Sequence, residues 1–489
     1  MVDKQAMAGV IKKGAASGAP TCRQNGAAQK NLPEGWEWKT LGEIADINPR
    51  IDKSKIADNL QVSFVPMPAV GAGDGQIDVS QLRPAREVKK GYTPFEEGDV
   101  LFAKITPCME NGKMAVVPKL NNGVGFGSTE FHVLRPRHDV AARYLYHYVS
   151  NASFRKEAAH SMTGAVGQKR VHTAYLSACP IPRAPLDHQK LIVAEIEKQF
   201  SRLDEAVAGL KRIKANLKRY KAAVLKAAVE GKLTEEWRKE HPDIEPASQL
   251  LKSILAARKQ KWEEKNPGKK YKEPAAPDTS NLPELPKGWV WATIDQVAEC
   301  LDSMRVPINK KERASREGTV PYYGANGQVG WIDDYIYNEP LVLVVEDETF
   351  TGRELPFCYK ISGKSWVNNH AHVLRNTKAV GIDYLNYSLA HYPFTRLTTG
   401  TTGRKKLTQA ALLSAPYPLA PIAEQMEIVS QVESSLSVTE ESEAAVETNL
   451  KRADRLRRAI LEKAFSGRLK VLRPYHSEEE DSKRVNGIK

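Results

Sequence analysis

Side chains that could catalyse a reaction or bind a metal ion are few and poorly spaced in this sequence. The segment His370-Ala371-His372 could place two imidazoles on one face of a strand, but no third ligand lies near it in the sequence. The acidic run Glu346-Asp347-Glu348 is not followed by a Glu-x-Lys segment at the spacing found in nuclease active sites. No GxxxxGK[ST] segment is present, so nothing predicts nucleotide hydrolysis. We therefore expect no catalytic residue, no metal site and no bound cofactor on this chain.

Loops rich in basic and amide side chains suit a different chemistry, the reading of a base sequence. Arg, Lys, Asn and Gln bond to base edges, and the basic ones also neutralise phosphates. For any one of these residues taken alone, the alternative to a DNA contact is a place in a solvated turn. The segments Gly164–Arg170 and Gly400–Lys406 stand out because both keep glycine and basic charge. The candidate DNA-binding residues are Lys104, Asn111, Lys113, Gln168, Lys169, Arg170, Asn326, Gln328, Asn368, Asn369, His370, Arg404, Lys405 and Lys406.

The overall composition is that of a basic globular protein. Lys and Arg number 72 against 59 Asp and Glu, a net charge of +13, which suits a polyanionic partner or simply a basic surface. The five cysteines lie far apart with no CxxC spacing, so neither disulfides nor a zinc knuckle is predicted. The apolar runs are too short for a bilayer, and the first thirty residues lack the apolar core of a signal peptide. We expect a soluble, cytoplasmic protein.

An internal repeat organises the chain. Leu32–Leu41 reads LPEGWEWKTL, and Leu285–Ile294 reads LPKGWVWATI. Residues 163–233 also align without a gap to residues 399–469, with shared glycines and prolines. The period is too long for a solenoid, so we interpret it as a tandem duplication of a whole module. The interiors between these shared ends differ strongly, which suggests one scaffold with two specificities.

Each module begins as a mixed region and ends as a long helix. The mixed regions carry strand signals, for example Val62–Val65, Asp99–Ala103 and Leu341–Val345. The helices carry an apolar stripe at steps of three and four, which predicts an antiparallel coiled coil. Polar Thr439 and Glu443 weaken the second stripe, and helices packed on their own domains are the alternative. The expected seam residues are Ile196, Phe200, Leu203, Leu210, Leu217, Val224, Val432, Leu436, Val446, Leu456 and Ile460.

The chain resembles the specificity (S) subunits of type I restriction-modification systems over about residues 32–470. Each matching segment is weak alone, but together, in order across the two modules, they are specific. They are Leu32–Trp36, Gly98–Pro107, Tyr322–Gly327, Pro180–Gln189, Pro416–Gln425 and Leu225–Leu233.

This resemblance implies an α+β fold with two mixed α/β target-recognition domains with β-rich cores, linked by the coiled coil. Each domain would read one half of a bipartite, asymmetric site in double-stranded DNA. The helices would set the gap and dock two modification subunits, which carry S-adenosylmethionine, while restriction subunits cleave. The expected parts are a disordered tail (1–31), recognition domain 1 (32–185), the central helix (186–233), a short helix and linker (234–284), recognition domain 2 (285–421), the C-terminal helix (422–470) and a tail (471–489).

Three other functions stay open from the sequence. A two-headed coiled-coil tether would bind no specific DNA sequence and would show little salt dependence. A specificity subunit of a combined nuclease-methyltransferase system would share the same architecture. A self-contained nuclease or methyltransferase would need a catalytic motif, and the sequence offers none.

Overall fold

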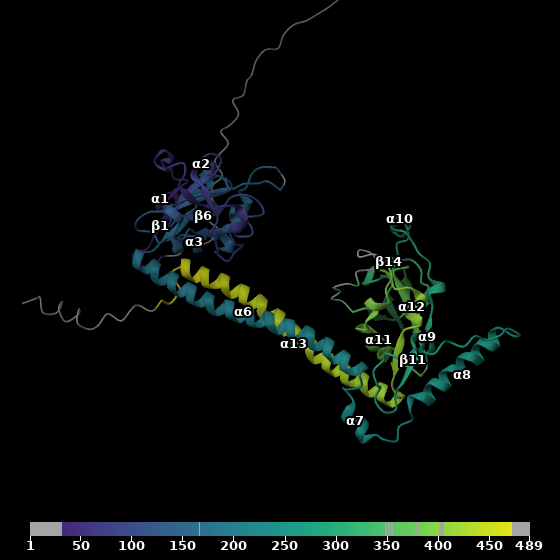
Figure 1. Cartoon of the computed structure of the whole chain (residues 1–489). Helices are drawn as coiled ribbons and strands as arrows, with labels where there is room; N and C mark the ends of the chain where they lie inside the picture. Colours follow the sequence, from purple (N-terminus) through teal and green to yellow (C-terminus); the bar gives the residue numbers. More distant parts are fainter. Residues whose placement is uncertain are drawn as a thin grey trace, which may run out of the picture. The chain divides into compact units, whose positions relative to one another are not determined.

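The computed structural model describes residues 32–471, except 166, 348–349, 351–352, 354–355, 378 and 401–404. The expected tail at 1–31 and all of the expected tail at 471–489 except Val471 lie outside the described residues. The chain forms two compact units, one from residues 32–209 and 449–471 and the other from residues 210–448. Each unit contains one mixed α/β head and parts of both long helices (Figure 1). Head 1 is residues 32–185 and head 2 is residues 285–421.

Two four-stranded sheets form the centre of head 1. The strands are β2 (Ala45–Ile47), β3 (Gln61–Val65), β4 (Leu82–Pro84), β5 (Thr93–Glu96), β6 (Val100–Ala103), β7 (Met114–Val116), β8 (Val124–Gly127) and β9 (Phe131–Pro136). One sheet has the order β2-β9-β6-β7 and is antiparallel throughout. The other has the order β4-β3-β8-β5, and β3 and β8 run parallel in it with Ser63 opposite Gly125.

Strand β6 shows why the sheets hold together. All its residues are buried, because successive side chains point to opposite faces and both faces are covered. Val100 and Phe102 enter one hydrophobic core, while Leu101 and Ala103 enter another. The helices that cover head 1 are α1 (Leu41–Ile44), α2 (Ala85–Val88), α3 (Ala142–Val149), α4 (Ala152–His160) and α5 (Thr173–Ala178).

Head 2 repeats this plan. Its strands are β12 (Ala298–Cys300), β13 (Val320–Gly324), β14 (Gly327–Ile332), β15 (Tyr337–Asn338), β16 (Leu341–Val345), β17 (Cys358–Ile361), β18 (Lys364–Val367) and β19 (Ala371–Asn376). The sheet orders are β12-β19-β16-β17 and β14-β13-β18-β15, with β13 and β18 parallel. The apolar run at β16 is buried on both faces, as β6 is. The helices are α9 (Ile294–Val297), α10 (Lys310–Ala314), α11 (Ile382–Ala390) and α12 (Gln409–Leu413).

The repeated tryptophan and proline motifs meet in a two-stranded sheet in each head. In head 1, β1 (Glu37–Thr40) pairs with β10 (Pro180–Arg183), and in head 2, β11 (Val290–Thr293) pairs with β20 (Pro416–Leu419). Trp38 lies opposite Pro182, and Trp291 lies opposite Pro418. Proline donates no hydrogen bond, but its carbonyl still accepts one. The Tyr144 hydroxyl donates to the Pro182 carbonyl at 2.7 Å, and Tyr384 does the same to Pro418 at 2.9 Å.

A repeated glutamine ties each head to the long helix that follows it. These helices are α6 (Leu186–Val229) and α13 (Ile422–Phe465). Gln189 is fully buried and donates to the carbonyls of Asp139 and Ala184 at 3.1 and 2.8 Å. Gln425 holds the matching place in α13 and donates to the Ala420 carbonyl at 2.9 Å. The glutamines therefore fix the heads on the helices.

The two long helices pack against each other in an antiparallel manner within each unit. In the first unit Ile196 of α6 shares a core with Ile460 and Ala464 of α13. In the second unit Val224 of α6 shares a core with Val432 of α13. The predicted α+β fold, with a duplicated head and an antiparallel helix pair, is therefore confirmed. Of the other expected seam residues, Val446 is buried and Phe200, Leu203, Leu210, Leu217 and Leu436 are partly buried.

Leu456 differs from the expected seam, because its side chain is 44% exposed. The seam passes instead through partly buried Arg457, one residue further around the helix, whose guanidinium lies 4.4 Å from the centre of the Phe200 ring. The polar seam positions also find partners. Thr439 is buried and bonds back to the Ser435 carbonyl at 2.7 Å, and Glu443 pairs with Lys221 at 2.8 Å.

The segment between the modules contains two helices, α7 (Glu235–Glu240) and α8 (Ala247–Lys265). Helix α8 packs on the core of head 2, whereas α7 meets head 2 through Arg238, whose guanidinium lies 5.9 Å from the centre of the Trp289 ring. Ile254 of α8 is buried in the core of head 2. Glu424, which is fully buried at the start of α13, accepts hydrogen bonds from Arg238 at 2.7 Å and from the Trp289 indole at 2.8 Å. Within the residues that the structure describes, no helix is long and apolar enough to cross a membrane.

Candidate nucleic-acid interface

In each head, a segment closed at its base by paired backbone hydrogen bonds lies shortly before the short helix α5 or α12. We call residues 163–170 basic loop 1 and residues 399–406 basic loop 2. The base of loop 1 is closed by paired backbone hydrogen bonds between Thr163 and Arg170, at 3.2 and 2.9 Å. Loop 2 is closed in the same way between Thr399 and Lys406, at 2.9 and 2.8 Å. The predicted site residue Arg404 lies outside the described residues.

Loop 1 exposes two of the predicted DNA-binding side chains. Gln168 and Lys169 are exposed, and neither side chain has a hydrogen-bond or ion-pair partner among the described residues. The backbone of Lys169 is fixed by Thr106, whose amide donates to the Lys169 carbonyl at 3.0 Å. Gly164 has a φ of +131°, and a Cβ there would lie 2.8 Å from the Gln168 carbonyl oxygen. Glycine is therefore required for the tight path that presents these side chains.

Arg170 belongs to the support of loop 1 rather than to its exposed surface. Its guanidinium donates two hydrogen bonds to the carboxylate of Glu130, at 2.9 and 2.8 Å. These hydrogen bonds hold the pKa of Glu130 below its ordinary value, against the opposing effect of burial. Such bidentate pairs are geometrically specific. Arg170 thus fixes the loop from which Lys169 projects.

The other predicted residues of head 1 divide in the same way. Lys104 directly follows β6, and its carbonyl accepts the Val171 amide at 2.9 Å, so it lies at the base of loop 1. Asn111 is exposed in the turn before β7. The Lys113 ammonium points inward and donates to the carbonyls of Met67 and Val70 at 3.1 and 2.9 Å. Lys113 is therefore held by the loop before β4.

At the base of loop 2, the basic side chains face carboxylates. Lys406 pairs with Glu346 at 2.8 Å, and the hydrogen bond to Glu346 raises the pKa of Lys406. His370 pairs through Nδ1 with Asp347 at 2.5 Å. Lys405 is partly buried and has no ion-pair partner among the described residues. Lys405 is therefore the basic side chain of loop 2 that the described structure leaves available.

A polar hollow of about 480 Å³ brings three of the predicted residues of head 2 together. Asn368, Asn369 and His370 line it beside Lys310 and Arg313 of α10. The two basic residues were missed from the sequence, although the run Lys310-Lys311-Glu312-Arg313 signals them. The Arg313 guanidinium lies 4.7 Å from the centre of the Tyr322 ring, which fixes it over that ring.

The hairpin between β13 and β14 holds the remaining predicted residues. Asn326 accepts a hydrogen bond from Arg353 at 2.8 Å, and Gln328 donates to the Gly330 carbonyl at 3.2 Å. Next to them on the edge strand β14, Val329 and Trp331 are exposed. The hairpin thus offers amide and aromatic groups together.

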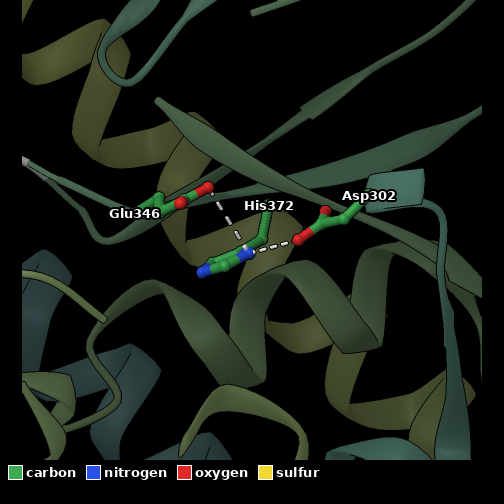
Figure 2. A group of neighbouring side chains, drawn as sticks. All are labelled: Asp302, Glu346 and His372. Atoms are coloured by element: carbon green, nitrogen blue, oxygen red, sulfur yellow. Dashed lines mark hydrogen bonds and ion pairs between the residues drawn. The ribbon is translucent and has the colours of Figure 1, made fainter. Parts of the chain in front are cut away.

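Figure 2 shows the acidic group that most resembles a metal site, made of Asp302, Glu346 and His372. Their ligand atoms lie within 4.8 Å of one another. Cationic side chains already occupy this group, because Arg305 lies 3.1 Å from Asp302 and 2.5 Å from Glu346, and Lys406 also pairs with Glu346. A metal ion would have to displace both cations. We therefore assign no metal to it, and His370 and His372 do not converge on a shared ligand.

The comparisons with known proteins decide the family. The model for the type I restriction modification DNA specificity domain matches residues 33–219 and again residues 286–452. The chain belongs to the family of type I restriction-modification specificity subunits. The sequence resemblance is therefore confirmed, and the DNA specificity domain is present in two copies.

Named relatives and solved structures agree with this family. The chain is 30% identical to the EcoAI specificity subunit of Escherichia coli, over 82% of this chain and 77% of the relative. It is 33% identical to the EcoEI specificity subunit of the same organism, over 58% and 54%. The HsdS subunit from Thermoanaerobacter tengcongensis shares the fold, with a TM-score of 0.55 at 20% identity over 90% of this chain and 99% of that one.

A chain from a structure of a type I R-M system also shares the fold of this specificity subunit. Its TM-score is 0.63 at 21% identity, over 90% of this chain and 100% of the other. The two relatives are named as specificity subunits of type I restriction enzymes. This agrees with the expectation that partner subunits carry out the chemistry.

Proposed function

We propose that each head of this specificity subunit reads one half of a bipartite, asymmetric site in double-stranded DNA. The observation that carries this proposal is a basic loop repeated in both heads, next to sheets whose sequences differ between the heads. Lys169 is exposed on loop 1 and Lys405 is partly buried at the matching place of loop 2, while the polar groups around them differ between the heads. Lysines on matching loops suit phosphate contacts, and different amide groups suit different base sequences.

The long helices would set the gap between the half-sites and dock two modification subunits. Each helix has 44 residues, which gives about 65 Å of helix at 1.5 Å per residue. The modification subunits would carry S-adenosylmethionine and methylate the DNA, restriction subunits would cleave it, and this chain would hold no cofactor. The assembly would work in the cytoplasm, where the DNA is.

Exchanging one head tests the proposal. Residues 41–179 of head 1 would be replaced by the corresponding residues of the EcoAI specificity subunit, leaving β1 and β10 largely in place. We expect one half of the methylated site to change while the other half and the gap stay the same. The matching exchange of residues 294–415 in head 2 is the control, and it should change only the other half.

The same experiment separates this proposal from a protein tether. A tether would give no methylated motif that follows either exchange, and its binding to a duplex would hardly depend on salt. A head that reads DNA through phosphate contacts should instead lose affinity steeply as the salt concentration rises. An exchange that leaves both halves unchanged would overturn the assignment of recognition to the heads.

A further inference from the structure

Each head holds a buried histidine against the backbone that follows its basic loop. His132 is 4% exposed, and its Nε2 lies 2.8 Å from the Val171 carbonyl oxygen. His372 is 1% exposed, and its Nε2 lies 2.8 Å from the Leu407 carbonyl oxygen. Val171 and Leu407 directly follow basic loops 1 and 2 and match in the repeat. Both histidines therefore anchor the base of a loop, and in both the Nε2 must donate to the carbonyl.

In head 1 the other ring nitrogen meets an amide. The Nδ1 atom of His132 lies 3.0 Å from Asn48 Nδ2. The orientation of this amide is fixed, because Asn48 Oδ1 accepts the Val133 amide at 3.0 Å. The Asn48 amide nitrogen must then donate, and His132 Nδ1 must accept. A neutral imidazole with its proton on Nε2 satisfies every group in this set.

In head 2 the other ring nitrogen meets a carboxylate (Figure 2). The Nδ1 atom of His372 lies 2.5 Å from Asp302 Oδ2, while Asp302 Oδ1 accepts the Val373 amide at 2.9 Å. Both ring nitrogens of His372 thus face oxygen acceptors. Only the protonated, doubly donating imidazolium satisfies both. One change between the heads, an amide in place of a carboxylate, reverses the protonation state that the anchor needs.

The charged groups around His372 agree with a cation at this position. Glu346 Oε2 lies 3.7 Å from its Nδ1. Asp302, Glu346 and Asp347 supply three carboxylates, whereas Arg305 and Lys406 supply two permanent cations. His370 on Asp347 is the other histidine of this group. Cys300 and Tyr337 also face Asp302, but burial raises their pKa values to about 11 and about 12, so both stay neutral near pH 7.

The surroundings of His132 favour its neutral form instead. Burial is the largest effect and holds the pKa of His132 below its ordinary value, and the positive charge of Lys104 acts in the same direction. The hydrogen bond to the Val171 carbonyl and the carboxylate of Glu130 oppose these effects without outweighing them, and Glu130 is already paired with Arg170. Protonation would also turn Nδ1 into a second donor against the fixed Asn48 amide.

We propose that these histidines are positioning residues that make the two basic loops respond to pH in opposite directions. The anchor of loop 1 holds when His132 is neutral and weakens as the pH falls through the histidine range. The anchor of loop 2 holds while His372 donates from both ring nitrogens and weakens once its imidazolium loses a proton. Given the proposed function, acid then weakens the contact with one half-site and alkali the contact with the other.

Hydrogen exchange of the full chain in complex with its modification subunits tests the anchors without any DNA. The amides to follow are Arg170 and Val171 at loop 1 and Lys406 and Leu407 at loop 2, all bonded to backbone in the structure. Protection factors, corrected for the intrinsic pH dependence of exchange, would be compared between about pH 5.5 and about pH 8.5, either side of the ordinary histidine range. We expect protection at Lys406 and Leu407 to fall about tenfold with rising pH and protection at Arg170 and Val171 to rise.

Two reciprocal substitutions separate titration from simple packing. Asp302→Asn copies head 1 into head 2 and should reverse the profile at Lys406 and Leu407. Asn48→Asp copies head 2 into head 1 and should make protection at Arg170 and Val171 fall with rising pH. The second variant keeps the test valid if the first fails to fold. Flat wild-type profiles at both loops, or profiles that neither substitution changes, would overturn the proposal.

A binding measurement then separates this inference from the proposed function. Affinity for a duplex carrying the mapped methylated site would be measured over the same pH range. If the affinity for the duplex changes with pH in step with the protection of the loops, both the histidine anchors and the proposed function are supported. If the loops respond to pH as expected but binding does not, the anchors stand, and the placing of these loops on DNA is overturned.

Discussion

At the scale of single residues, neighbours in one loop have different tasks. Lys169 is exposed with no ion-pair partner among the described residues, while Arg170 is bound by two hydrogen bonds to Glu130. The sequence predicts both as DNA-binding residues and does not separate them, because Glu130 lies 40 residues away along the chain. The basic residues of α10 were missed for a related reason, since the fold alone brings Lys310 and Arg313 to Asn368.

Lys169→Ala should weaken DNA binding across sequences without destabilising the head. The loss of one phosphate contact should reduce the slope of log affinity against log salt by about one. Fluorescence anisotropy on a duplex in a salt series measures this slope. Lys156→Ala, which removes an exposed lysine of α4, is the control and should leave the slope unchanged.

Arg170→Ala should act differently from its neighbour. It removes the pair with Glu130 and loosens the loop, so both the affinity and the melting temperature of the protein should fall. The pair is partly exposed, so a modest loss of stability is expected. An unchanged melting temperature together with a salt slope reduced by about one would show that Arg170 contacts phosphate directly.

At the scale of elements, the repeat made most of the fold predictable. Strand signals at β3, β6 and β16 and the stripes of α6 and α13 are all found as expected. The apolar stripe placed Leu456 in the seam, but the pattern could not show that Arg457 packs on Phe200. It also could not show why Thr439 and Glu443 are tolerated, since Lys221 lies on the other helix.

The buried carboxylate of Glu424 should be a main support of the second unit. It accepts hydrogen bonds from Arg238 of α7, from Thr234 just before α7 and from Trp289 just before β11, which joins both segments to the start of α13. Glu424→Gln leaves Arg238, only 15% exposed at its side chain, without its charge partner. We expect the free energy of unfolding to fall by about 3 kcal/mol.

Chemical denaturation of the variant measures this loss. Glu433→Gln removes an exposed carboxylate from the same helix and should change the stability by less than about 0.5 kcal/mol. Equal effects of the two substitutions would mean that the network around Glu424 adds nothing to stability.

At the scale of the whole molecule, the two long helices should set the gap between the half-sites. Deleting Lys211–Leu217 from α6 together with Ala444–Leu450 from α13 removes one heptad from each. These segments include the paired side chains of Lys214 and Glu447, so the seam on either side is kept. Seven residues correspond to about 10 Å of helix, or about three base pairs of DNA.

We therefore expect the gap in the recognised site to shorten by about three base pairs while both half-sites stay the same. Sequencing of methylated DNA from cells that express the variant with its modification subunit measures the gap. Deleting only one of the two segments is the control, because it breaks the pairing and should abolish methylation. An unchanged gap in an active double-deletion complex would contradict the role of the helices as a ruler.

This chain should supply two half-site readers to a methylating complex. The most direct test is to express it with its modification subunit in a host that lacks such a system, and to map the methylated adenines of the whole genome. We expect one motif with two specified halves separated by a gap of fixed length. A single continuous motif, or no motif from a complex that is purified intact, would contradict it.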